Sequence, residues 1–265
     1  MPEGDTIFRA ARTLHRALAG KPVVAFESVF PALTRVDEDE PVNGRIVERV
    51  EAVGKHILMR FSGNLILRTH MRMNGSWHIY RRGEPWQRSR RDMRIVVATS
   101  DFEAVAFTVP VAEFLTEKGV RRHPDLTRLG PDLLSETFDS ADAVARMRAR
   151  APEAVGDVLL NQRVVAGIGN VFKSEVCWAE QVSPFTRIGA IDGPARQRIY
   201  ATAQHQLTSN LTTNRRTTYR NGLAVYRRAR LPCPRCGTTI KTRRDATNRS
   251  TYWCPACQPE AAATT

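Results

Sequence analysis

The first residues of the chain suit covalent chemistry at a carbonyl carbon. They read Met1-Pro2-Glu3-Gly4-Asp5-Thr6, and we expect Met1 to be removed, which leaves Pro2 with a free secondary amine. Such α-amino groups titrate near ~7.7–8, so a useful share is uncharged and nucleophilic at neutral pH. The iminium formed by a secondary amine keeps its charge and withdraws electrons, and Glu3 could transfer a proton at the same carbon. Taken alone, the segment favours a simpler interpretation, a helix start with Asp5 or Thr6 as N-cap.

The cysteines predict a metal site near the C-terminus. Cys233, Cys236, Cys254 and Cys257 form two C-x-x-C pairs separated by 17 residues. Thiols in this spacing bind one tetrahedral zinc ion from two tight turns, and reduced cytosolic cysteines favour metal over disulfides. We therefore predict one structural zinc ion. Cys177 stands alone in an apolar stretch and is expected to be a buried packing residue.

The segment around these cysteines is strongly basic. Two β-like runs, Thr238–Arg243 and Ser250–Trp253, lie between the pairs and predict a two-stranded zinc ribbon. From Arg215 to Arg249 there are eleven Lys or Arg residues and one acidic residue. A surface with this excess suits the phosphates of DNA or RNA. Arg249, at the turn of the ribbon, is the predicted phosphate contact.

A lysine in the N-terminal half is a second candidate cation. Val53, Ile57, Met59 and Phe61 alternate along one predicted strand face, and Lys55 falls on that face. An inward lysine could hold a phosphate in a cleft. The alternative is a charge that protects a sheet edge from pairing, which is common.

A glycine-rich link joins two predicted helices. It reads Val165-Ala166-Gly167-Ile168-Gly169-Asn170 and predicts a tight turn in which backbone N–H groups and the Asn170 amide could hold a phosphate. Glycine turns between helices are frequent, so this pattern alone is weak evidence.

Length and charge place the chain among two-domain globular proteins with a polyanionic partner. The 265 residues are 42% hydrophobic and 25% charged, with a net charge of +13. Nucleic acid is the favoured partner, and an anionic membrane is the weaker alternative. With neither a membrane span nor a signal peptide evident, we expect a cytoplasmic protein.

The hydrophobic pattern predicts an α+β fold. Ile7, Ala11, Leu14 and Leu18 recur at helical spacing, and short β-rich runs between Val23 and Phe107 predict an antiparallel β-sandwich or barrel. Beyond residues 110–130 the pattern becomes helical. The predicted strands are Val23–Val29, Arg45–Glu51, His56–Phe61, Leu65–Thr69, Arg94–Ala98 and Ala104–Phe107, and the predicted helices are Ser140–Arg150, Pro152–Gln162, Val171–Gln181 and Pro194–Leu211.

These separate motifs, in this order, resemble the formamidopyrimidine-DNA glycosylase/endonuclease VIII family of base-excision repair enzymes. The resemblance rests on the Pro-Glu-Gly start, Lys55, the Gly-Ile-Gly-Asn170 turn and the four-cysteine ribbon that ends in Gln258, and it covers essentially the whole chain. It implies an N-terminal β-sandwich preceded by a helix, then a helix–two-turn–helix domain with a zinc ribbon. The implied domains are 1–115, 125–225 and 226–260.

The resemblance also implies a reaction. Pro2 would displace a damaged base from the deoxyribose and Glu3 would protonate the ring oxygen, with Lys55 as the third catalytic residue. Lys55, Asn170 and Arg249 would grip phosphates, and Met73 would fill the space left by the extruded base. Two successive eliminations would then leave a one-nucleotide gap. The implied partner is damaged DNA, bound by a monomer.

Details of the sequence favour the endonuclease VIII branch, which acts mainly on oxidised pyrimidines. The chain opens Pro-Glu-Gly-Asp-Thr, and its segment Phe107–Ala112 lacks the Pro-Arg-Arg-Phe-Gly loop of the other branch. The stretch from Leu211 to Tyr226 is also short for the base-capping loop of that branch. Arg72-Met73-Asn74 differs from the Gln-Leu-Tyr of the best-known endonuclease VIII, which leaves the opposite-base preference open. Two alternatives remain, a non-catalytic zinc-ribbon protein that binds nucleic acid, and an enzyme of the same mechanism that acts on oxidised purines.

Overall fold

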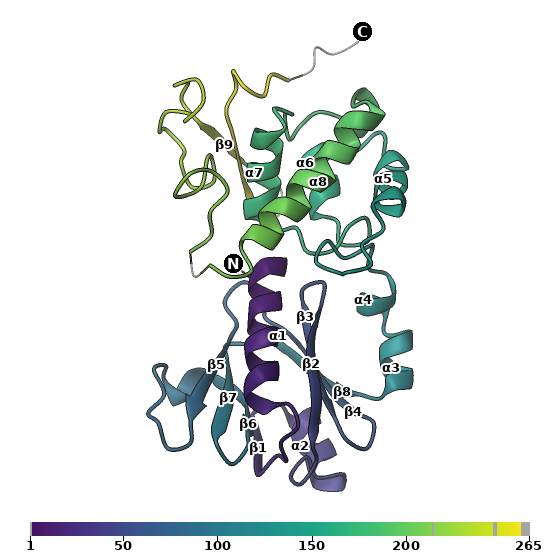
Figure 1. The fold of residues 1–265 in the computed structure, drawn as a ribbon, viewed down its shortest axis with the longest axis vertical. Helices are drawn as coiled ribbons and strands as arrows, with labels where there is room; N and C mark the ends of the chain where they lie inside the picture. The colour runs from purple at the N-terminus through teal and green to yellow at the C-terminus, as the bar shows by residue number, and fades with distance from the viewer. Residues whose placement is uncertain (1, 214, 246–247, 261–265) are drawn as a thin grey trace. The chain divides into compact units, whose positions relative to one another are not determined.

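The protein folds into two compact units that divide between Arg128 and Leu129. The structure is a computed structural model and describes residues 2–213, 215–245 and 248–260. Met1, whose removal the sequence predicts, lies outside the described residues. The first unit combines helices with two β-sheets and the second contains helices and a β-hairpin, so the fold is α+β as predicted (Figure 1).

Helix α1 (Gly4–Leu18) holds the start of the chain in place. Its stripe of Ile7, Ala11, Leu14 and Leu18 is buried in the core of the first unit, as the spacing predicts. The N-cap is Glu3, whose carbonyl accepts the N–H groups of residues 6 and 7 at 2.9 and 3.0 Å. The expectation of Asp5 or Thr6 as N-cap is therefore wrong, because the helix begins two to three residues earlier.

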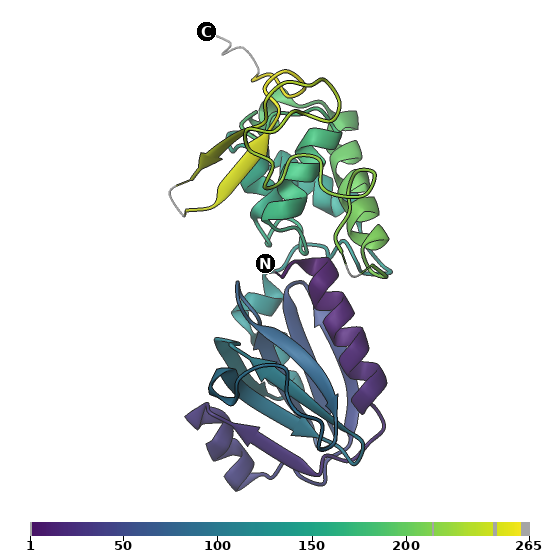
Figure 2. The same cartoon turned by 90° about the vertical axis from the view of Figure 1, so that its left-hand side faces the viewer.

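The first unit is a sandwich of two antiparallel four-stranded sheets. The sheet orders are β1-β6-β7-β5 and β2-β3-β4-β8, and the two layers are visible in Figure 2. Apolar side chains of α1 and of both sheets form one core between them. The strands are β1 (Ala25–Ser28), β2 (Val47–Val53), β3 (His56–Phe61), β4 (Leu65–His70), β5 (Ser76–Arg81), β6 (Met93–Ala98), β7 (Phe102–Phe107) and β8 (Val111–Leu115).

The sequence pattern does not predict several elements of this unit, among them α2 (Pro31–Asp39), β5 and β8. In the loop between β5 and β6, Trp86 packs against Tyr80 and Phe107 on the outer face of the first sheet. This small second core gives the loop an apolar anchor that local periodicity does not reveal.

Buried polar groups cover the outer face of the second sheet. Arg68 of β4 is almost completely buried and contacts the carboxylates of Glu113 and Asp125. Asp125 belongs to α4 (Pro124–Thr127), which follows α3 (Glu117–Arg122). The rings of His56 and His70 meet edge to face, with centroids 4.6 Å apart. Burial, and then the nearby charges of arginines 68 and 72, lower the pKa of His56 to about 2 and that of His70 to about 4.

The second unit packs helices against a zinc-ribbon hairpin. Strands β9 and β10 pair in antiparallel register, and Figure 2 shows the hairpin projecting from the side of the helices. The predicted helices are present with bounds that differ by up to three residues from the prediction, and β10 matches its prediction. No helix in the described part of the chain is long and apolar enough to span a bilayer. The elements are α5 (Ser140–Arg148), α6 (Val155–Leu160), α7 (Asn170–Ala179), α8 (Gly193–Ser209), β9 (Lys241–Arg244) and β10 (Ser250–Trp253), with short 3-10 turns at Arg90–Asp92 and Ile188–Ala190.

The two buried histidines predict that the sandwich loses stability in acid. Below pH 6.5 the unfolded chain binds protons that the folded histidines do not bind. These histidines therefore do not reduce the free energy of unfolding above pH 6.5. Below that pH the free energy of unfolding falls, down to about pH 4 for His70 and about pH 2 for His56. For His56 it falls by up to about 1.4 kcal/mol per pH unit.

Hydrogen exchange of the β3 and β4 peptides, corrected for its intrinsic pH dependence, measures this effect. We expect His56→Phe to flatten the acid dependence, whereas His205→Phe, at an exposed position of α8, should leave it unchanged. Equal acid dependence in the wild type and His56→Phe would contradict the assignment.

Candidate active site and zinc centre

The N-terminal candidates Pro2 and Glu3 lie at a fixed point of the first unit. Pro2 is half-buried and directly precedes the helix, and the Glu3 side chain is fully buried. Asp5, one residue into α1, is also fully buried, and its carboxylate lies 4.0 Å from the guanidinium of Arg9. The structure thus sets Pro2 beside a buried carboxyl group, and the helix core holds both against fraying.

Lys55 lies in a turn rather than on a strand face. Gly54 and Lys55 form the two-residue turn between β2 and β3, in which Val53 pairs with His56. Gly54 has φ of 57°, which is the conformation that the first position of such a hairpin turn requires. The expected inward face is therefore wrong, because the turn interrupts the alternation. Lys55 is half-buried at the end of the hairpin, and its charge helps to lower the pKa of His70.

Met73 occupies an exposed turn that follows β4. The turn begins at His70, whose Nδ1 accepts the backbone N–H of Arg72 at 3.1 Å. At Gly75 a Cβ atom would lie 2.5 Å from a backbone oxygen, so only glycine fits there. Met73 is 66% exposed, an unusual state for a large apolar side chain. The structure therefore presents Met73 to solvent, as an inserting residue requires.

The glycine turn before α7 is organised by one glutamine. The Gln162 amide donates to the carbonyls of Leu160 and Ile168 and accepts the N–H of Gly167 at 3.1 Å. Gly167 has φ of 107°, which other residues rarely adopt. Gly169 then serves as N-cap, and Asn170 is the first residue of α7. The amide of Asn170 thus lies at a helix N-terminus, where an anion is favoured.

The structure brings Asn170 and Arg249 to one place. The Asn170 amide nitrogen donates to the carbonyl oxygen of Ser250 at 2.7 Å, and Ser250 directly follows Arg249. One turn further along α7, Lys173 Nζ donates to Thr251 Oγ1 at 2.6 Å. Arg249 itself is exposed, and its N–H is held by the Asp245 carboxylate. These contacts tie the ribbon turn to the start of α7.

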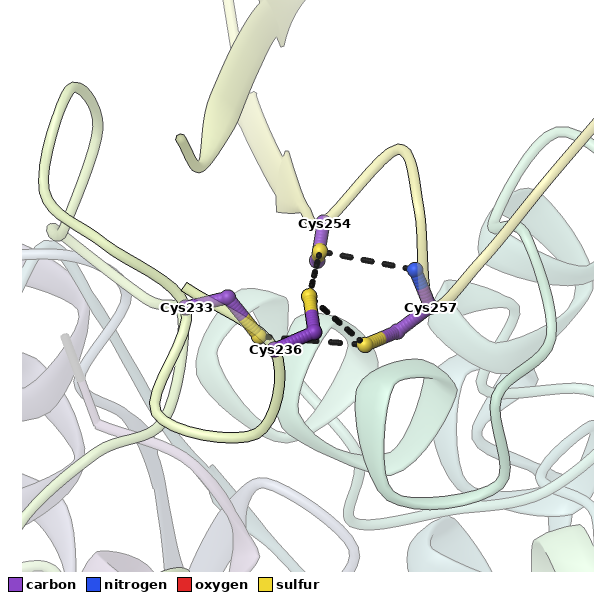
Figure 3. Close-up of side chains that lie close together, drawn as sticks. All are labelled: Cys233, Cys236, Cys254 and Cys257. Carbon is purple, nitrogen blue, oxygen red and sulfur yellow. Dashed lines mark hydrogen bonds between the residues drawn. The ribbon is translucent and has the colours of Figure 1, made fainter. Parts of the chain in front are cut away.

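The four predicted metal ligands converge on one point. Their sulfur atoms all lie within 4.8 Å of one another, and Figure 3 shows them turned toward a common centre. The closest pairs, Cys236 with Cys257 and Cys236 with Cys254, are 3.3 and 3.5 Å apart. Zinc–sulfur bonds of about 2.3 Å give sulfur–sulfur edges of roughly 3.8 Å, so these distances suit a tetrahedral zinc ion.

Comparisons with known proteins agree with this arrangement. Residues 1–110 match the formamidopyrimidine-DNA glycosylase N-terminal domain, residues 129–221 the helix–two-turn–helix (H2TH) domain of the same enzyme, and residues 230–259 the zinc finger found in FPG and IleRS. The chain belongs to the formamidopyrimidine-DNA glycosylase/endonuclease VIII family. The resemblance seen in the sequence and the predicted zinc ribbon are confirmed.

Relatives within the family carry endonuclease 8 names. "Probable endonuclease 8 2" of Streptomyces coelicolor is 39% identical, over 97% of this chain and 94% of its own. "DNA-(apurinic or apyrimidinic site) lyase Nei2" of Mycolicibacterium smegmatis is 36% identical, over 97% and 99%. A Lactococcus lactis Fpg in complex with DNA containing an abasic site has the same fold, with a TM-score of 0.84, 21% identity, and 98% and 100% coverage.

Sequence reasoning assigned no structural role to three buried polar residues that position this family site. Lys173 is only 2% exposed, and burial lowers its pKa. Glu175 accepts the backbone N–H groups of residues 224–226. Gln258 accepts the Cys254 N–H and donates to the carbonyl of Val182, both at 2.9 Å. A charged side chain inside an apolar stretch, as at Lys173 and Glu175, was the signal that the sequence offered. This signal does not identify the residue that the side chain contacts.

The zinc centre predicts a ranked thiol reactivity. Hydrogen bonds from Thr238 lower the pKa of Cys236 to about 6, so this residue is a thiolate at neutral pH. Burial raises the pKa of Cys177 to about 12. In zinc-stripped protein at pH 7, we expect iodoacetamide to modify Cys236 first and Cys177 last, as measured by peptide mass spectrometry. Zinc-loaded protein, the control, should be protected at all four ligands. Equal labelling with and without zinc would contradict the assignment.

Proposed function

We propose that this protein is a DNA glycosylase with AP-lyase activity in base-excision repair, and that it acts through an iminium intermediate on Pro2. The observation that carries the proposal is the fixed Pro2 beside the fully buried Glu3. Full-length relatives named endonuclease 8 and Nei2 lyase support the reaction class. The charge of +13 supports a DNA partner.

The chemistry follows from a secondary amine at the sugar. The Pro2 nitrogen attacks C1′, the bond to the base breaks with its electron pair on the base, and Glu3 protonates the ring oxygen as the sugar opens. The resulting iminium makes the C2′ proton acidic. Loss of that proton expels the 3′ phosphate, and a second elimination expels the 5′ phosphate. Water then releases Pro2 and completes the excision of one nucleotide.

The remaining candidates position the DNA. In this proposal Lys55, Asn170 and Arg249 bind the phosphates that flank the lesion, because these are the cationic or helix-start groups of the family motifs. The exposed Met73 enters the helix where the base has left the stack. The contact between Asn170 and Ser250 supports a shared role for the α7 start and the ribbon turn.

Oxidised pyrimidines are the proposed substrate class. The Pro-Glu-Gly-Asp-Thr start and the endonuclease 8 names of the relatives support this choice over oxidised purines. A purely DNA-binding role explains the zinc ribbon, but it gives no reason for the Pro2 and Glu3 pair. We further propose that the protein acts as a monomer in the bacterial cytoplasm, in line with its bacterial relatives.

Borohydride trapping tests the nucleophile. We expect wild-type protein to form a covalent adduct with DNA that carries an abasic site, because hydride reduces the iminium to a stable amine. Pro2→Gly should lose most of the adduct while duplex binding changes little. Cys177→Ser, at a buried position that the mechanism does not use, is the control and should trap normally. Undiminished trapping by Pro2→Gly would identify another amine.

A lesion panel tests the substrate class. We expect duplexes with thymine glycol or an oxidised uracil to be cut at least tenfold faster than a duplex with 8-oxoguanine, measured as single-turnover rates on gels. A duplex with a preformed abasic site controls for lyase activity, since both substrate classes share that step. Faster release of 8-oxoguanine would assign the enzyme to purine lesions.

A further inference from the structure

The last turn of α7 contacts the zinc centre through a tryptophan. Trp178 is only 4% exposed, and its indole Nε1–H donates to the sulfur of Cys233 at 3.4 Å. The two residues lie 55 positions apart in the sequence, so this contact joins a helix to the first cysteine knuckle. The proposed glycosylase reaction does not use Trp178.

Several contacts fix the ring of Trp178 in place. The guanidinium of Arg235, in the first knuckle, lies 4.2 Å from the ring centroid. It also donates to the carbonyl oxygens of Trp178 and Ala179 at 3.1 and 3.3 Å, which satisfies two acceptors at the C-terminal end of α7. Tyr219 packs edge to face on the ring, with centroids 5.0 Å apart. The indole N–H is therefore held in its direction toward Cys233.

The sulfur that accepts this N–H is a predicted zinc ligand. An indole N–H that leaves water on folding destabilises the protein unless it finds an acceptor. A neutral thiol is a weak acceptor, whereas a thiolate carries a charge that strengthens the hydrogen bond. Zinc binds cysteine as the thiolate. The contact between Trp178 and Cys233 is therefore stronger when the metal is bound.

This donor comes from outside the ribbon. Cys254, by comparison, accepts the backbone N–H of Cys257, which belongs to the same knuckle, at 3.5 Å. A contact of that kind forms with the knuckle turn itself. The contact from Trp178 forms only when α7 is packed against the ribbon, so it makes zinc binding depend on that packing.

We propose that Trp178 is a positioning residue of the zinc centre, whose N–H stabilises the Cys233 thiolate and raises the affinity of the site for zinc. The stabilisation applies to the metal-bound thiolate more than to the neutral thiol, so it favours the loaded site over the empty one. Helix α7 thus helps to hold the ion although it supplies no ligand. The inference does not depend on the proposed glycosylase reaction.

Trp178→Phe tests the N–H, because phenylalanine keeps an aromatic ring for Arg235 and Tyr219 but has no donor. We expect zinc affinity, measured by competition with a chelating dye, to fall about 10–100-fold, the usual loss when a hydrogen-bond partner of a metal ligand is removed. The matched control is Trp253→Phe, which removes an indole N–H one residue from Cys254 and should bind zinc as the wild type does. Equal zinc affinities of the two variants would overturn the proposal.

Cobalt substitution separates the effect of the N–H from an effect of packing. A hydrogen-bond donor lowers the energy of the sulfur lone pairs. Its loss in Trp178→Phe should therefore shift the sulfur-to-cobalt charge-transfer absorption to longer wavelength, while Trp253→Phe should keep the wild-type spectrum. Weaker zinc binding by Trp178→Phe with an unchanged cobalt spectrum would mean that the ring only fills space beside the knuckle, and the proposal would fail.

The wild-type protein provides a test that no folding defect of a variant can affect. With a spin-active cadmium isotope in place of zinc, a scalar coupling between the metal and an indole proton passes through the sulfur and the hydrogen bond. We expect this coupling on one of the four indole N–H signals, the one with nuclear Overhauser contacts to Tyr219. A Trp178 signal without the coupling would show that the hydrogen bond does not form, and would rule out the proposed role.

Discussion

The second unit depends on one polar contact, the docking of α7 onto strand β10. Asn170 and Lys173 lie one helical turn apart and donate to Ser250 and Thr251. Both donors are almost completely buried, so each would lose its partner without regaining water if the two elements separated. This cost keeps the ribbon turn that carries Arg249 at the start of α7, and the phosphate-binding role proposed for both ends depends on it.

A comparable constraint acts at the start of the chain. Terminal residues are poorly ordered unless something ties them down. Here the apolar stripe of α1 is buried in the sandwich core, and Glu3 caps the helix with its own carbonyl group. The position of Pro2 therefore depends on the packing of residues such as Ile7 and Leu14. The amine proposed at Pro2 would gain a fixed direction from this packing, which a free terminus lacks.

Buried or half-buried polar side chains also order the segments that lack regular structure. Glu175 fixes residues 224–226, Gln162 shapes the turn before α7, and Gln258 closes the second cysteine knuckle. Each satisfies backbone N–H groups that no helix or strand would satisfy. Side-chain hydrogen bonds to backbone N–H groups thus support the segment at residues 224–226, the N-terminus of α7 and the zinc centre.

The sequence alone determined the features with a local period or spacing. Helical spacing predicted α1, the cysteine pairs predicted the zinc ribbon, and the bounds of β10 were predicted correctly. Lys55 was placed on the wrong element because the positive φ of Gly54 breaks the strand period with a turn. The partners of Lys173 and Glu175 lie between 43 and 78 residues away along the chain, so only the tertiary structure could show them. Local patterns specify which element forms, whereas a buried polar contact exists only after distant segments have packed.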